Sequence, residues 1–126
     1  MSEATELIRE GLGVIRHNGW TRFIRMDQEG RVCALGALDA ALLPQAQRRY
    51  ISWEGLASND DDPVHQRAAE ILARNIPDSP PSRRSSYQQS LSYECQVADY
   101  NNSLKLGDQA LIEEWFEKAA ADERVD

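Results

Sequence analysis

Four residues of this chain have side chains suited to nucleophilic catalysis: Cys33, His17, His65 and Asn101. A cysteine at the start of a helix lies in the field of the helix dipole, which lowers the thiol pKa and favours the reactive thiolate. Either histidine can then serve as the base, and Asn101 or Asp99 can orient it, as in a cysteine–histidine–asparagine site. The residue types therefore allow a cysteine-dependent hydrolase or transferase that uses Cys33.

A second interpretation makes Cys33 a small buried residue. Asp39 is the only charged residue between Cys33 and Leu43, and a helix that is apolar on every side normally lies at the centre of a fold. Many residues of this segment are small enough to let neighbouring helices approach closely: Cys33, Ala34, Gly36, Ala37, Ala40 and Ala41. The local signatures of cysteine proteases are absent around Cys33. We therefore expect Cys33 to be buried at the start of a central helix.

Structural roles are also open to the other candidates. His17 falls near the end of the first predicted helix, where the dipole stabilises a protonated imidazole. Asn101 falls at a helix end, where its amide can cap the helix or bond buried backbone. The cysteines and histidines have neither CxxC nor HxxxH spacing, so we predict no metal site and no cofactor. The acidic run Asp60–Asp62 lacks the spacing of a calcium loop.

Helical periodicity indicates the elements that must position these residues. A first helix is predicted to reach His17, with a stop at Asn18–Gly19. The remaining helices are predicted, in chain order, over 33–43, over 45–56, from Asp62–Pro63 to Leu72, over 87–100, and from Asp108 to Ala119. The last of them carries the strongest apolar stripe: Leu111, Ile112, Trp115, Phe116 and Ala119.

The segment 20–32 has the composition of a short β-hairpin. Residues 21–26 favour extended chain, Asp27–Gly30 supplies turn residues, and Arg31–Val32 can pair back. A two-stranded hairpin is marginal alone, so we expect it to lie against the helices with Trp20 as its anchor. The predicted fold class is mainly α: a compact single-domain helical bundle with a short β-hairpin near residues 20–32.

The chain has 126 residues, which corresponds to one globular domain over 1–126. The segment 76–86 contains three prolines, four serines and two arginines, so we predict a flexible surface loop there. Its arginines can contact an anion or a partner, and large aromatic residues are further candidates. The candidate interaction residues are Arg83, Arg84, Trp20 and Trp53, although a tryptophan in the position of Trp20 is more often a core residue.

The charge balance limits the classes of partner. There are 14 Lys and Arg against 21 Asp and Glu, which gives a formal net charge of −7. Because phosphate contacts need clustered cations, a broad nucleic-acid-binding face is excluded. The acidic exterior either keeps the protein in solution or fits a basic groove on a partner. A DNA-mimicking inhibitor would need acids spaced along one face, whereas these concentrate at helix starts and at the C-terminus.

The N-terminus lacks the basic start and apolar run of a secretory signal. No segment approaches the roughly 20 apolar residues needed to cross a membrane. We therefore expect a cytoplasmic protein with no membrane partner, in which both cysteines stay reduced. The sequence does not define the oligomeric state.

Two segments resemble a family of small, uncharacterised actinobacterial and actinophage proteins. In that family a Trp precedes a turn and a G-x-V-C-x-x-G-A-[LI] helix, and a W-N-D triplet precedes a T-x-x-E-V-type helix near the C-terminus. Trp20, Gly30, Cys33 and Gly36–Leu38 match the first pattern. Tyr100–Asn102 matches the triplet with Trp and Asp replaced. Gly107–Asp108 stands where Thr is usual. The resemblance covers about half the chain and implies a helical fold and a phage or host setting, with no activity attached.

These observations predict a small acidic intracellular protein-binding module, encoded by a phage and acting on a host or cellular protein. The alternative is a cysteine-dependent hydrolase or transferase that uses Cys33.

Overall fold

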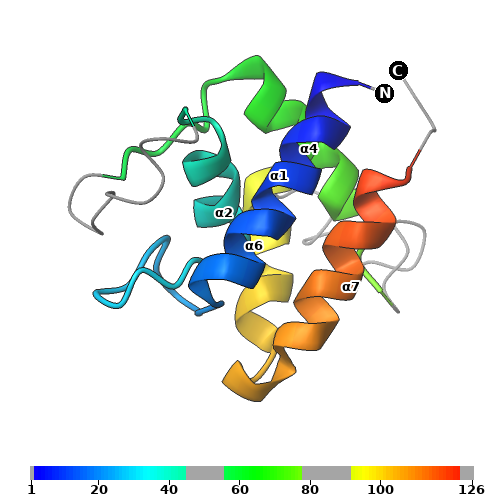
Figure 1. Cartoon of the computed structure of the whole chain (residues 1–126). Coiled ribbons are helices and arrows are strands. Elements are labelled where there is room, and N and C mark those ends of the chain that lie inside the picture. Colours follow the sequence, from blue (N-terminus) through cyan, green and yellow to red (C-terminus); the bar gives the residue numbers. More distant parts are fainter. Residues whose placement is uncertain (1, 45–55, 78–91, 123–126) are drawn as a thin grey trace.

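The computed structural model describes residues 2–44, 56–77 and 92–122. In these residues the chain forms five α-helices and one short 3-10 helix (Figure 1). They are α1 (Glu3–Asn18), α2 (Ala34–Ala41), α4 (Pro63–Arg74), α6 (Tyr93–Ser103), η2 (Leu106–Asp108) and α7 (Gln109–Ala120). The prediction of a mainly helical fold is confirmed.

Short polar side chains begin three of these helices, each by accepting a hydrogen bond from a backbone N–H of the first turn. Ser2 accepts from Thr5 at the start of α1. Asp62 accepts from two N–H groups at the start of α4, where the helix was predicted to begin. Ser92 accepts from the N–H of Cys95 at 3.2 Å. Helix α6 therefore begins at Tyr93, and residues 87–91 of the predicted helix over 87–100 lie outside the described residues.

The core forms around α1, which packs against α2, α4 and α7, while α4 also packs against α6. Figure 1 shows α1 crossing the bundle between α2 and α7. The apolar faces of α1 and α7 meet closely, since a Cβ on Gly11 would lie 3.3 Å from the ring of Phe116. Leu111, which was included in the predicted α7 stripe, is exposed.

The segment 20–32 is not the predicted β-hairpin. This part of the described chain contains no strand, only isolated bridges that join Trp20 and Met26 to Val32. Phe23 has a φ of +69°, which breaks an extended conformation. Its N–H donates to the Asn102 side chain instead of to a facing strand. Tertiary hydrogen bonds thus override the extended preference of the sequence. We call residues 20–32 the α1–α2 loop.

This loop lies directly on the first turn of α2. The N–H of Cys33 donates to the Arg25 carbonyl oxygen at 3.2 Å. A Cβ placed on Gly36 would lie 1.8 Å from the same oxygen, well inside van der Waals contact. Glycine at position 36 is therefore what lets the loop backbone touch the helix.

Several predicted features fall outside the described residues. They are the helix over 45–56 with Trp53, and most of the loop over 76–86 with Arg83 and Arg84. Within the described ranges, no helix combines the length and the apolar character that a membrane span requires.

Candidate functional site

Cys33 is the N-cap residue of α2 and is 9% exposed, so the prediction that it is buried is confirmed. Its Sγ accepts a hydrogen bond from the N–H of Gly36 at 3.4 Å. Burial raises the pKa of the Cys33 thiol, and this effect outweighs the lowering by that N–H. A buried thiol with a raised pKa is a poor nucleophile, which weighs against the cysteine-dependent alternative.

We expect Cys33 in the folded protein to react with iodoacetamide on the order of tenfold or more slowly than the exposed Cys95. Mass spectrometry of each cysteine peptide after timed labelling at several pH values measures this. The urea-unfolded protein provides the fully reactive reference. Rapid labelling of folded Cys33 below about pH 8 would contradict the burial and raised pKa, and would favour catalysis.

The four predicted catalytic residues do not form one bonded site. His17 is exposed in the last turn of α1, whereas His65 is buried in α4 and Asn101 is buried near the end of α6. Asp99, the alternative orienting residue, is exposed. Within the described part of the chain, no hydrogen bond or ion pair joins Cys33 to any of the other four.

Asn101 has the predicted structural role of a buried amide. Its Oδ1 accepts from the indole N–H of Trp20 at 2.7 Å and from the backbone N–H of Ala34 at 2.9 Å, and its Nδ2 donates to the Thr21 carbonyl at 3.3 Å. One side chain thus ties α6 to the α1–α2 loop and to the start of α2. Trp20 is buried in the core, so it does not present its ring as an interaction surface.

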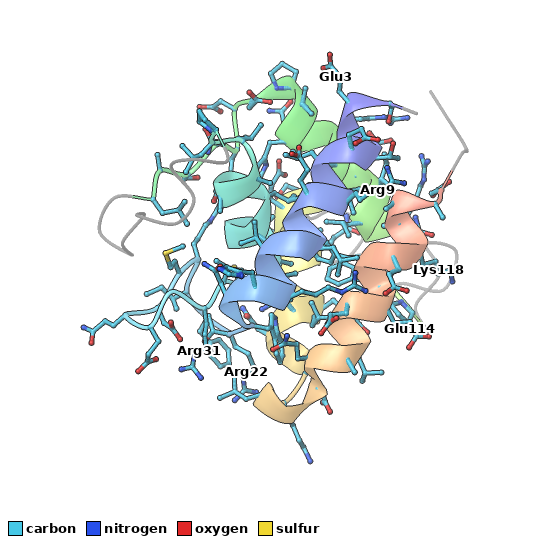
Figure 2. The ribbon with its side chains drawn as sticks, viewed as in Figure 1. Glu3, Arg9, Arg22, Arg31, Glu114 and Lys118 are labelled. Atoms are coloured by element: carbon cyan, nitrogen blue, oxygen red, sulfur yellow. The ribbon has the colours of Figure 1, made fainter. Side chains whose placement is uncertain are left out.

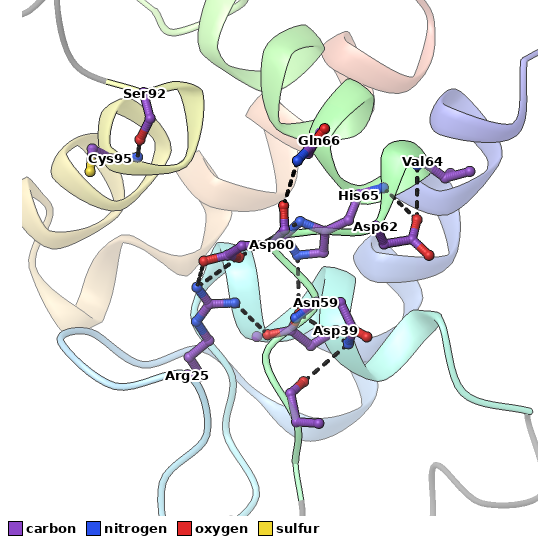
Figure 3. Close-up of polar contacts among 12 residues, drawn as sticks. Arg25, Asp39, Asn59, Asp60, Asp62, Val64, His65, Gln66, Ser92 and Cys95 are labelled. Atoms are coloured by element: carbon purple, nitrogen blue, oxygen red, sulfur yellow. Dashed lines mark hydrogen bonds and ion pairs between the residues drawn. The ribbon is translucent and has the colours of Figure 1, made fainter.

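The most unusual polar group is a set of charges around Asp39, whose side chain is fully buried in α2. Arg25 donates to Asp39 Oδ2 at 2.6 Å, and the backbone N–H of Asn59 donates to Oδ1 at 3.0 Å. The Nε2 of His65 lies 3.1 Å from the same Oδ1. Figure 3 shows these side chains converging from the loop, from α2 and from the start of α4. We call Arg25, Asp39, Asn59, Asp60 and His65 the buried charge cluster.

Asp60 closes this cluster at the surface. Both of its carboxylate oxygens accept from Arg25, each at 2.9 Å, and one lies 3.9 Å from the Nδ1 of His65. Among the described residues, neither ring nitrogen of His65 makes a well-aligned hydrogen bond, although its Nε2 is close to the Asp39 carboxylate. Burial alone would raise the pKa of Asp39, but the contacts with His65 and Arg25 hold it below its ordinary value.

The chemistry open to the buried charge cluster is limited by access. Asp39 and His65 have no exposed side-chain surface, so neither can meet a substrate in this conformation. The described residues also contain no group of three or more His, Cys, Asp or Glu side chains placed to hold a metal ion. The arrangement instead attaches Arg25, and with it the α1–α2 loop, to the body of the protein. Sequence reasoning noted Asp39 only as an isolated charge and did not find its partners.

The part of the loop next to Arg25 is exposed and apolar. Phe23 is 73% exposed and Ile24 is 46% exposed, and Figure 1 shows the loop projecting from the bundle beside the end of α1. The loop is nevertheless well anchored, because Phe23 N–H donates to Asn102 at 2.9 Å and Arg22 donates to the Leu104 carbonyl at 2.8 Å. We call Arg22, Phe23 and Ile24 the Phe23 surface. The sequence carried no signal for this exposure, since both apolar residues fit a predicted strand.

A separate open groove of about 510 Å³ lies between the first turns of α4 and α6. Its lining exposes more apolar than polar surface, and its Arg67 is paired with Glu70 at 2.6 Å. This pairing leaves no concentrated charge that would select an ionic ligand.

The fold and these sites together define a small, mainly helical protein whose exposed loop is fastened by a buried charge cluster. The chain belongs to the family of unknown function DUF6197, which matches residues 1–122. Comparisons with curated proteins and with solved structures found no match. The prediction of an uncharacterised family is confirmed, while an origin in actinobacteria or their phages stays a prediction.

Proposed function

We propose that this chain is a protein-binding module that docks on a cellular protein through the Phe23 surface. The observation that carries the proposal is the exposed ring of Phe23, held at a positive φ on an anchored loop. Non-glycine residues at positive φ persist only where the surrounding structure holds them, and they concentrate at functional sites. An exposed aromatic side chain on an ordered support is a typical anchor of a protein interface, because little entropy is lost when it binds.

Other observations support a binding role over catalysis. Cys33 is buried and the pKa of its thiol is raised, so the cysteine-dependent alternative lacks an accessible nucleophile. The net charge of −7 disfavours nucleic acid as the partner. The resemblance to actinophage proteins makes a host protein the expected partner.

We expect Phe23→Gly to weaken partner binding by about 30-fold or more, as loss of an anchoring aromatic does. The free energy of unfolding should stay within about 1 kcal/mol of the wild-type value, because glycine tolerates the positive φ at this position. Wild-type and variant proteins are used to capture partners from an actinobacterial lysate, the stoichiometric partner is identified by mass spectrometry, and its Kd is measured by calorimetry.

The matched control is Tyr93→Ser, which removes another exposed aromatic ring, 47% exposed, from the first turn of α6. Binding should be unchanged in this variant. Equal affinity of wild type and Phe23→Gly for the captured partner, or repeated failure to capture one, would overturn the proposed docking surface.

A further inference from the structure

The ring of Phe23 is not presented alone. The guanidinium of the neighbouring Arg22 lies over it, 5.0 Å from the ring centroid. The same guanidinium donates to the Leu104 carbonyl at 2.8 Å, which holds it in place. Figure 2 shows Arg22 beside the turn that joins α6 to α7. A partner pocket that covers the Phe23 ring must therefore also exclude water from Arg22.

The ion pairing of Arg22 differs from that of the other arginines in the loop. Arg25 is paired with Asp39 and Asp60, and Arg31 is paired with Asp27 and Glu29. In the described ranges, no carboxylate forms an ion pair with Arg22, whose contacts are the Leu104 carbonyl and the Phe23 ring.

Docking would bury the positive charge of Arg22, which is unfavourable unless the partner supplies a negative charge. A guanidinium has five N–H donors, and the Leu104 bond uses one of its nitrogens. Burying a charged group without a partner is strongly unfavourable, whereas a buried arginine paired with a carboxylate forms two parallel hydrogen bonds. The exposed Lys105, next in the chain to Leu104, adds a second positive charge at this end of the molecule.

We infer that the partner surface combines an apolar pocket for Phe23 with a carboxylate that pairs with Arg22. This inference rests on the proposed docking function and adds the chemistry of the partner: an Asp or Glu at the rim of an aromatic-sized apolar pocket. The partner is thus recognised by shape at Phe23 and by charge at Arg22.

The test uses the captured and identified partner and measures its Kd for wild type, Arg22→Gln and Arg22→Lys at low and at high salt. Arg22→Gln keeps a donor for Leu104 but removes the charge, and it should weaken binding by roughly 30-fold and reduce the salt dependence of Kd. Arg22→Lys should be intermediate, because it keeps the charge but loses the two-pronged geometry. Arg31→Gln is the matched control, since Arg31 is already paired within its own loop, and its Kd should equal that of wild type.

The outcomes separate the inference from the proposed function. If Phe23→Gly abolishes binding while Arg22→Gln leaves Kd and its salt dependence unchanged, the proposed docking surface is supported and the inferred carboxylate on the partner is wrong. If neither variant alters Kd, the docking surface is also wrong. Loss of binding after phosphatase treatment of the partner would show that a phosphate group on the partner, and not a carboxylate, pairs with Arg22. A double-mutant cycle that combines Arg22→Gln with substitution of one partner Asp or Glu would identify the pairing residue as the one whose effect on Kd is not additive with that of Arg22→Gln.

Discussion

Gly36→Ala is expected to lower the free energy of unfolding by about 3 kcal/mol, the upper end of the usual range for overpacking. The added Cβ would lie 1.8 Å from the Arg25 carbonyl oxygen and 2.6 Å from its carbon. Both atoms belong to the backbone, so the clash is relieved only if the α1–α2 loop moves away from α2. That movement also breaks the hydrogen bond from Cys33 N–H to Arg25. Urea denaturation monitored by circular dichroism measures the loss.

The expected loss of stability in Gly36→Ala has the opposite sign to the change that helix propensity alone predicts. In a helix interior, alanine is favoured over glycine by about 1 kcal/mol when nothing opposes it. Gly13 provides the matched control, because it lies in α1 and a Cβ there meets no atom within 4 Å. We expect Gly13→Ala to raise the free energy of unfolding by up to about 1 kcal/mol. A Gly36→Ala protein that is as stable as Gly13→Ala would show that the loop does not rest on α2.

Asp39→Asn is expected to lower the free energy of unfolding by about 3 kcal/mol, as does removal of one partner from a buried ion pair. The amide removes the negative charge that faces Arg25 and His65, and its N–H groups would point at the donors of Arg25 or Asn59. Asp60→Asn is the control, because Asp60 is 42% exposed and also bonds to Arg25. We expect that variant to lose about 1 kcal/mol or less, as exposed ion pairs do.

The pH dependence of stability separates the charge of Asp39 from its shape. Although burial opposes it, the contacts with His65 and Arg25 hold the pKa of Asp39 below its ordinary value. The stabilising contribution of this carboxylate is therefore fully present above the unfolded-state pKa of about 3.9, and it is lost as pH falls from there through the lower folded-state pKa. Urea midpoints measured from neutral to acid pH should fall more steeply for wild type than for Asp39→Asn. Parallel profiles would show that the charge of Asp39 does not stabilise the fold.

Local sequence signals were sufficient for most helices. Asp62–Pro63 begins α4 as predicted, and the spacing of apolar residues correctly indicated the buried face of α7 except for Leu111. The small apolar residues around Cys33 predicted its burial at the start of α2. These signals succeed because caps and helix faces depend on residues only three or four positions apart.

The conformation of the α1–α2 loop was decided by contacts that no local pattern contains. Arg25 bonds to side chains 14 and 35 residues away, and Asn101 reaches Trp20 and Ala34 across 81 and 67 residues. These contacts exist only after α2, α4 and α6 have packed, and together they replace the hairpin that composition alone favoured. The exposure of Phe23 follows from the same packing, because the bonds to Asn102 and Leu104 turn its ring toward solvent while Arg25 is held at the buried charge cluster. The sequence by itself thus determined most of the described helices and much of the core, whereas the tertiary structure decided which side chains are paired inside and which are exposed.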